Sequence, residues 1–340
     1  MVYNHMYMPM DYGRDPREDY DALVERVTLW DVGAERQTEL RGPDALSLAD
    51  YLSPRTLRHM TVGECRYVPV CDESGAIMVE CIVLRPWHDV VWFAHSDADL
   101  TLWARGVAHG ATYDVHIEEP DVAPLQLQGP RARGVLAPLV EGDLAALGHY
   151  RCMVTRVAGV DAVVSRTGWS RANGYEIYPL GSERALDVWD ALVDVGRPAG
   201  LLVTGPNIVR AVEQGISDTQ YATNSGMNPF EAGMGHLLDL DRDAFIGRDA
   251  LRQVRAAGPE RRTVGLIADG DPFPRMEQFW PVLVDGRAVG VARWAVWSFG
   301  LGQNIAIALV EASLPDDARF VIAAPDGDCR ARAHQIPFLP

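Results

Sequence analysis

Short strand-like pieces separated by tight-turn signals fill the sequence from residue 258 to its end. They are rich in β-branched and aromatic residues, and they read RTVGLIA, WPVLVDGRAVGVARWAV, NIAIALV, ARFVIAAP and CRARAHQIPF. Asp-Gly and Pro-Asp-Gly steps between or within them are turn signals. Such a succession favours a small antiparallel barrel or sandwich. We place its start in AAGPERR, which divides the chain into domains 1–257 and 258–340.

The sequence before this boundary alternates strand-like and helix-like pieces. Residues 88–95 are predicted to form a strand, and Asp97 or Asp99 is predicted to cap a helix that ends at Gly110. Residues 160–166 and 174–180 are further expected strands. A helix is expected over residues 183–195, with one apolar face formed by Leu186, Trp189, Leu192 and Val193. We therefore predict an α+β fold with a β-rich C-terminal domain.

The charge of the chain and its lack of lysine exclude several functions. The 340 residues carry a formal charge of −16, which repels nucleic acid. All 31 basic residues are arginine. Schiff-base enzymes, pyridoxal-phosphate enzymes and Walker-type ATPases all need a lysine amine. These three classes are therefore excluded.

The cysteines indicate neither a disulfide framework nor a metal centre. There are five, no CxxC occurs, and three of them fall within seventeen residues, at Cys65, Cys71 and Cys81. That spacing allows zinc in principle, but isolated free thiols usually pack as small buried hydrophobes. No apolar run is long enough to span a bilayer, and the first residues do not read as a secretion signal. We expect a cytoplasmic protein without metal or membrane partner.

Common catalytic motifs are missing. The sequence contains no GxGxxG after a strand, no GxSxG and no HExxH. Motifs alone therefore predict no chemistry.

Eight segments follow one another along the chain: YNHMYMP, VTLWDVGAERQTELRGPDAL, GECRYVPVCDESGAI, FAHSDADLTLWARG, EEPDVAPLQLQGP, SRTGWSRANGYEIY, NPFEAGMGHLLDLDRDAFIGRDAL and QNIAIALV. In this order they resemble the folate-binding glycine-cleavage T-protein superfamily. The resemblance is strongest to its branch of tetrahydrofolate-dependent demethylases, which includes dimethylsulfoniopropionate demethylases. The resemblance implies two interlocked α/β subdomains around a central folate cavity, plus a C-terminal antiparallel β-barrel. It also implies tetrahydrofolate as the cofactor.

Two carboxylates stand out under this resemblance. Glu176 in GYEIY matches the family acid that grips the pterin, whose adjacent amino and ring N–H groups suit a bidentate carboxylate. Glu80 matches the family's central acid, which is normally an aspartate, so its reach differs by one methylene. A catalytic or orienting role for Glu80 is the expectation, and a strand-end charge is the alternative.

The remaining site residues are also transferred from the family. Trp169 and Tyr178 match pocket aromatics of the demethylase branch, and we assign Tyr178 a catalytic role as proton donor. Tyr67 corresponds to a tyrosine near the folate, and Gln126 is expected to support the cavity wall. The alternative for each aromatic residue is packing in the core.

Three departures from the family pattern bear on function. T-proteins have an arginine two positions before the acid equivalent to Glu213, where this chain has Ala211 with Arg210 one place earlier, so Arg210 is our candidate for that folate contact. Trp294 and Trp297 replace smaller residues and are expected to shape the donor pocket. Relatives also have a preceding segment, and in the sulfonium demethylase it supplies a lysine for the substrate carboxylate. Its absence disfavours dimethylsulfoniopropionate as the donor.

The function implied is transfer of a methyl group from a small O-, N- or S-methyl donor to N5 of tetrahydrofolate. An onium donor would need an aromatic cage, with Trp169, Tyr178, Trp294, Trp297 and Trp30 as candidates. A methoxy donor would need an acid, with Tyr178 or Glu80 as candidates. Two alternatives remain open: an aminomethyltransferase of glycine cleavage acting on a carrier protein, which Ala211 and Glu80 disfavour, and a folate-binding accessory protein without activity.

Overall fold

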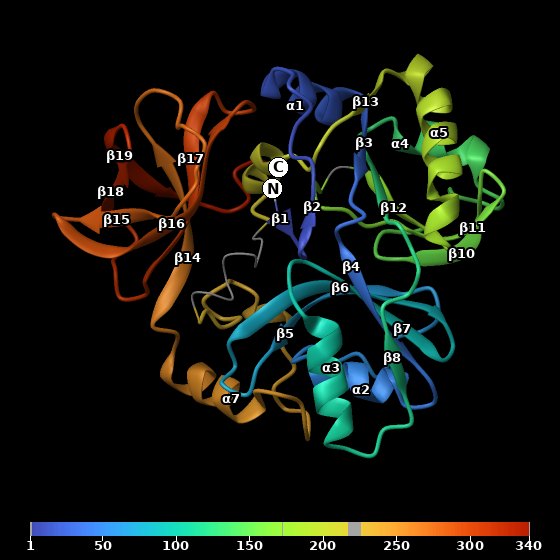
Figure 1. Cartoon of the computed structure of the whole chain (residues 1–340). Helices are drawn as coiled ribbons and strands as arrows, with labels where there is room; N and C mark the ends of the chain where they lie inside the picture. Colours follow the sequence, from blue (N-terminus) through green and yellow to red (C-terminus); the bar gives the residue numbers. More distant parts are fainter. Residues whose placement is uncertain (1, 172, 217–225, 340) are drawn as a thin grey trace.

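The computed structural model describes residues 2–171, 173–216 and 226–339, and shows a mixed six-stranded sheet, an antiparallel five-stranded sheet and a closed barrel (Figure 1). The six-stranded sheet has the order β10-β11-β12-β9-β3-β13. Its strands are β3 (Val27–Asp31), β9 (Leu125–Gln128), β10 (Cys152–Val157), β11 (Val160–Ser165), β12 (Gly174–Pro179) and β13 (Leu201–Val203). We call it the upper sheet, from its place in Figure 1.

The second sheet has five strands in the order β5-β6-β7-β4-β8, and we call it the lower sheet. Its strands are β4 (Arg36–Arg41), β5 (Cys65–Cys71), β6 (Ile77–Trp87), β7 (Val90–His95) and β8 (His116–Glu118). A short hairpin of β1 (Val2–Tyr3) and β2 (Met6–Tyr7) lies at the centre of the molecule (Figure 1).

The chain crosses between the two sheets more than once. It leaves β3 of the upper sheet directly for β4 of the lower sheet, and it returns from β8 to β9. It comes back to β3 once more when β13 pairs with it in parallel. Residues 36–118, which hold all strands of the lower sheet, are therefore inserted between β3 and β9 of the upper sheet, and this is the predicted interlocking of two subdomains.

Helices cover the outer face of each sheet, and the inner faces meet. α4 (Ala132–Leu136) and α5 (Ala185–Gly196) pack on the upper sheet, and α2 (Ala45–Leu52) and α3 (Leu100–His109) on the lower one. Between the sheets, Trp92 and Tyr178 form an edge-to-face pair with centroids 5.9 Å apart. This seam holds the two sheets together beside the cavity described below.

The C-terminal region is a closed antiparallel barrel in the order β14-β17-β16-β15-β18-β19. Its strands are β14 (Arg261–Ala268), β15 (Trp280–Val284), β16 (Arg287–Ser298), β17 (Gln303–Glu311), β18 (Arg319–Ala324) and β19 (Gly327–His334). The predicted fold class, including the barrel, is confirmed. Helix α7 (Arg248–Ala257) ends just before β14 begins, near the position where turn chemistry placed the change.

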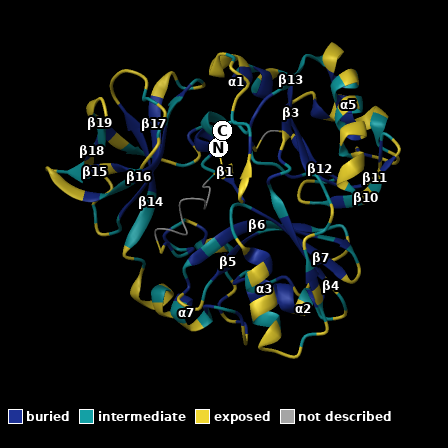
Figure 2. Cartoon of the chain, viewed as in Figure 1, coloured by how far each residue is buried: buried dark blue, intermediate teal, exposed yellow. Residues whose placement is uncertain are grey.

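The remaining elements are α1 (Pro16–Glu25), α6 (Ile208–Glu213) and the short 3-10 segments η1 (Ala137–Leu139), η2 (Ser182–Arg184), η3 (Arg197–Ala199) and η5 (Gly235–Leu237). Buried residues concentrate in the strands, while α3, α5 and α7 expose their outer faces (Figure 2). None of the described helices has both the length and the apolar character to cross a membrane.

Two local predictions need correction. Leu186 does not belong to the buried face of α5, because its exposed fraction is 71% and Val188 is buried with Leu192 instead. Asp99 is the N-cap residue of α3, but its side chain makes no capping bond. Its Oδ1 lies 3.4 Å from Arg36 Nη1 and 3.4 Å from His5 Nε2 instead.

Candidate functional site

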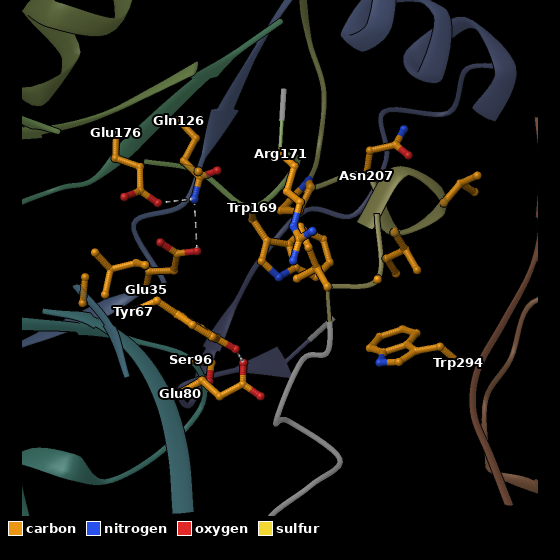
Figure 3. A pocket seen from close by; sticks show the side chains of 18 of the residues that line it. Glu35, Tyr67, Glu80, Ser96, Gln126, Trp169, Arg171, Glu176, Asn207 and Trp294 are labelled. Atoms are coloured by element: carbon orange, nitrogen blue, oxygen red, sulfur yellow. Dashed lines mark hydrogen bonds between the residues drawn. The ribbon is translucent and has the colours of Figure 1, made fainter. Parts of the chain in front are cut away.

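A cavity of about 1390 Å³ lies where the two sheets and the barrel meet. The upper sheet contributes Gln126 and Glu176, the lower sheet Tyr67 and Glu80, and β16 of the barrel Trp294. Figure 3 shows these side chains around the space, with Trp294 across it from the two acids. The cavity therefore brings most of the predicted site residues together.

Strand register explains why Glu176 and Gln126 adjoin. They are directly paired residues of β12 and β9, and Ser165 of β11 pairs with Glu176 on its other side. Directly paired residues point to the same face of a sheet. Gln126 Nε2 donates to Glu176 Oε1 at 3.0 Å, and this row faces the cavity.

In the part of the chain that the structure describes, only neutral groups donate to the Glu176 carboxylate. Its Oε2 accepts from the hydroxyls of Thr167, Ser165 at 3.3 Å and Tyr178 at 3.1 Å. Burial raises the pKa of Glu176 above its ordinary value of 4.5, and these hydroxyls offset part of the rise. A buried carboxylate without a cation is costly, and ligand N–H groups would lower that cost.

The loop that carries Trp169 is packed tightly over β9. Ser170 donates to Gln128 Oε1 at 2.8 Å. A Cβ atom added at Gly174 would lie 2.2 Å from the same oxygen. A side chain at that position would displace the Gln128 amide that Ser170 contacts, and Trp169 in the same loop lines the cavity.

The second acid stands on the lower sheet. Tyr67 pairs with Ile82, and Glu80 pairs with Pro69, so Tyr67 and Glu80 are diagonal neighbours on the inner face. The Tyr67 hydroxyl donates to Glu80 Oε2, as Figure 3 shows. Glu80 is 8% exposed and lines the cavity.

The structure adds a third acid, Glu35, which sequence reasoning missed. It lies in the crossing from β3 to β4, and Gln126 Nε2 also donates to its Oε1 at 3.3 Å. Figure 3 places it between Gln126 and Tyr67. The only signal in the sequence was a charged residue inside an otherwise apolar crossing, which no motif marks.

Trp30 does not form part of an aromatic cage. Its register with Gln126 puts it on the inner face of the upper sheet, but Trp169 packs against it and its exposed fraction is 0%. The residue therefore lies beneath the cavity wall and does not line it.

Tyr178 is also displaced from its predicted role. It is fully buried in the seam between the sheets, and it does not line the cavity. Burial and the neighbouring Glu176 raise the pKa of its hydroxyl. It keeps its proton and donates to Glu176, so it positions that acid and does not reach a donor.

Arg210 does not line the cavity. It lies in α6, and its Nη1 is 3.5 Å from Glu213 Oε2. Glu213 also accepts from Tyr20 at 2.8 Å and from Ser298 at 2.6 Å. Arg210 therefore belongs to a buried contact between α1, α6 and the barrel, and the predicted folate contact is not available to it in this conformation.

Trp294 and Trp297 both line the cavity. They are three residues apart on β16, and successive side chains of a strand alternate between its faces. Their indoles therefore point to opposite faces and do not stand together in one cage.

The three neighbouring cysteines do not converge. Cys65, Cys71 and Cys81 belong to three separate buried clusters. Among the residues that the structure describes, no group of three His, Cys, Asp or Glu side chains has the spacing of a metal site.

The chain has the fold of an aminomethyltransferase. The solved structure of glycine cleavage system aminomethyltransferase T from Bartonella henselae superposes with a TM-score of 0.88 and 18% identity, covering 100% of this chain and 93% of that one. The sequence matches the GCVT N-terminal domain over residues 1–242 and the glycine cleavage T-protein C-terminal barrel domain over residues 261–339. This protein belongs to the glycine-cleavage T-protein family.

Its relatives include a demethylase and aminomethyltransferases. Dimethylsulfoniopropionate demethylase DmdA of Ruegeria pomeroyi is 35% identical, with 92% of this chain and 85% of the relative covered. The aminomethyltransferase of Moorella thermoacetica is 32% identical, with 97% and 91% covered. Both names describe enzymes that act on a one-carbon group.

Proposed function

We propose that this protein is a tetrahydrofolate-dependent methyltransferase that takes a methyl group from a small donor. The observation that carries the proposal is the row of Glu176 and Gln126 on the cavity wall. Family membership and the similarity to a demethylase support it.

The polar groups present fit a pterin. Glu176 is a buried acceptor without a cation, and among the described residues Gln126 Oε1 is buried with no hydrogen-bond partner. A pterin edge presents adjacent N–H donors, which these acceptors can receive. Trp169 beside them supplies an apolar face for a flat ring.

When bound, tetrahydrofolate supplies a nucleophilic ring nitrogen, N5, that accepts the one-carbon group. The residues of this chain contribute mainly position. Glu176 and Gln126 fix one edge of the ring, and methyl transfer needs the reacting atoms about 3–3.5 Å apart and in line. Such positioning lowers the barrier without covalent participation of the protein.

Glu80 and Tyr67 are the groups for proton handling. Both line the cavity, and the tyrosine hydroxyl already donates to the carboxylate. A donor that leaves as an alkoxide could receive a proton from this pair, whereas an onium donor leaves neutral and needs none. Tyr178 is not available for this step because it lies in the seam.

The cavity has room for two ligands. Its volume of about 1390 Å³ exceeds the range of about 300–1,000 Å³ typical of single-ligand sites. A small-molecule donor fits beside the cofactor without a carrier protein, and this forms part of the proposal.

The test is an anaerobic titration with tetrahydrofolate, followed by tryptophan fluorescence. The wild-type protein should bind saturably and Glu176→Ala should not, with circular dichroism showing that the variant is folded. Onium, N-methyl and methoxy donors are then screened for 5-methyltetrahydrofolate by mass spectrometry.

Three other outcomes would overturn the proposal. Turnover only with an aminomethyl-loaded carrier protein would identify an aminomethyltransferase. Folate binding without turnover across the panel would identify an accessory protein. If the wild-type protein does not bind tetrahydrofolate, all three functions are contradicted.

A further inference from the structure

Two arginines at one end of the cavity have no acidic partner. Arg55 and Arg171 both line the cavity, and among the described residues neither guanidinium forms an ion pair. The Arg55 side chain donates from Nη1 to the carbonyl of Tyr67 at 2.6 Å. Arg55 is half-buried in the cavity wall, and Arg171 is exposed.

The surroundings of Arg55 make its charge costly. Burial lowers its pKa, and the neighbouring guanidinium of Arg66 lowers it further. Arg66 has an acid nearby, since Glu64 lies 3.8 Å from it and 3.8 Å from Arg151. An anion beside Arg55 would offset both the loss of hydration and the repulsion.

Tyr150 links the two arginines. Burial raises the pKa of its hydroxyl, while the charges of Arg171 and Arg55 lower it, and all three residues line the cavity. Its backbone is fixed on both sides, with its N–H donating to Arg166 and its carbonyl accepting from Cys65 at 2.9 Å. The φ angles of Tyr150 and Arg171 are +54° and +48°, in the left-handed region that non-glycine residues rarely adopt.

This end of the cavity adjoins the Glu176 row. Arg171 is on the loop that carries Trp169, and it projects into the space beside that residue (Figure 3). The charge of Glu176 also acts on Tyr150. One elongated ligand could therefore contact both ends, with its hydrogen-bond donors at Glu176 and its negative charge at the arginines.

We propose that Arg55 and Arg171, with the hydroxyl of Tyr150, form a carboxylate-binding subsite that holds the glutamyl end of folate while Glu176 and Gln126 hold its pterin end. This inference rests on the proposed function, because it assumes that the ligand is a folate. Arginine suits the role, since its planar fork binds a carboxylate in a bidentate manner.

The experiment compares two ligands that differ in the glutamyl end. Tetrahydrofolate and 6-methyltetrahydropterin, which lacks the aminobenzoyl-glutamyl portion, are titrated anaerobically into the wild-type protein, Arg55→Gln and Arg171→Gln. Each substitution should weaken tetrahydrofolate binding about tenfold, the value of one charge-assisted contact, and leave tetrahydropterin binding unchanged. Arg171→Lys, which retains the charge, should recover part of the loss.

Arg166→Gln is the matched control. It removes the same charge from a residue whose backbone carbonyl accepts from the Tyr150 N–H, but Arg166 does not line the cavity and its Nη1 donates to the carbonyl of Leu147 at 3.3 Å. Its affinity for both ligands should match that of the wild-type protein. An equal loss in this control would show a general charge effect and overturn the proposal.

Failure of this inference is distinguishable from failure of the proposed function. If tetrahydrofolate binding survives both substitutions, or if both ligands weaken equally, the carboxylate subsite is wrong although folate binding stands. If the wild-type protein binds neither ligand, the proposed function fails and the subsite fails with it.

Discussion

Asp50 of the lower subdomain and Glu176 of the upper sheet are both buried carboxylates with several hydrogen-bond donors, yet their surroundings differ in charge. Asp50 in α2 accepts from the backbone N–H groups of Leu57 at 2.6 Å and Arg58 at 3.0 Å, and it pairs with Arg242 at 2.8 Å. Among the described residues, the hydrogen-bond partners of Glu176 are all neutral.

The two pKa values accordingly move in opposite directions. Burial alone would raise the pKa of Asp50, but the backbone donors and two guanidiniums outweigh it and lower the pKa. For Glu176 burial dominates and the pKa rises. A buried acid with cations stabilises the fold, whereas a buried acid without one is suited to receive a ligand.

Asp50→Asn should produce the largest change. It leaves Arg242, which is 5% exposed in its side chain, without its counter-charge. Removing one partner of a buried ion pair costs about 3–5 kcal/mol, so the free energy of unfolding measured with urea should fall by about 3 kcal/mol. Asp241→Asn, at an exposed ion pair with Arg255, is the control and should change it by less than about 0.5 kcal/mol. Equal effects would contradict the comparison.

Glu176→Gln should change binding and not folding. The amide keeps the shape but removes the charge that receives ligand N–H groups, so tetrahydrofolate affinity should fall about 100-fold, or about 2.7 kcal/mol. The free energy of unfolding should stay within about 1 kcal/mol of the wild-type value, because no cation loses its partner. Calorimetric titration measures the tetrahydrofolate affinity, and urea unfolding measures the free energy of unfolding. A large loss of stability would make Glu176 a structural acid like Asp50.

The pH dependence of stability should have opposite signs at the two positions. The lowered pKa of Asp50 contributes stability that is present above its unfolded-state pKa and is lost as pH falls through the folded value. The raised pKa of Glu176 contributes stability that is present below its ordinary value of 4.5 and is lost as pH rises through its folded value.

Urea unfolding from pH 7 down to well below 3.8, the ordinary pKa of Asp50, measures both effects. On acidification the stability difference between the wild-type protein and Asp50→Asn should narrow, and the wild-type protein should gain relative to Glu176→Gln. Each unit of pKa displacement corresponds to about 1.4 kcal/mol. Parallel slopes for the two variants would contradict the assigned directions.

Tyr178→Phe should give the smallest effect. It removes one donor from Glu176, at 3.1 Å, and leaves the edge-to-face contact with Trp92 in place. We expect the free energy of tetrahydrofolate binding at neutral pH to weaken by about 1 kcal/mol, or about fivefold in affinity. The pKa of Glu176 should rise further, because one donor to its carboxylate is lost. Trp87→Phe, at the other side of Trp92, serves as the control. Complete loss of turnover with unchanged binding would instead restore Tyr178 as a catalytic acid.

The barrel and the strands flanking Glu176 could be predicted because local signals specify them. Turn residues and alternating apolar residues mark β14 to β19, and GYEIY is both a strand pattern and a family motif. The burial of Trp30 beneath the cavity wall could not be predicted in the same way. Its face follows from the strand, but whether Trp169 covers it depends on a loop that packs over β9.

The other misplaced residues have a similar cause. Tyr178 occupies an expected strand, and a contact with the opposite sheet determines its surroundings. Arg210 lies in α6, where it contacts Glu213, an acid that also binds α1 and the barrel. Glu35, Arg55 and Arg171 were not predicted, because they come from separate segments that only the fold brings to one cavity. Sequence patterns indicate which residues are neighbours within one helix or strand. A site between the upper sheet, the lower sheet and the barrel depends on contacts among several such elements.

The crossing strands also limit when the chain can fold during synthesis. Val27 of β3 pairs with Leu201 of β13, and Leu29 pairs with Leu127 of β9. The upper sheet is therefore incomplete until the ribosome has released residue 203: β3 can pair with β9 before then, but its other edge stays open until β13 emerges. The barrel closes among residues 261–334 alone, although three of its six strand pairings join strands that are not consecutive in the sequence. Contacts distant in sequence slow folding, so in a ribosome-bound nascent chain β3 of the upper sheet should gain its full protease resistance only after β13 emerges.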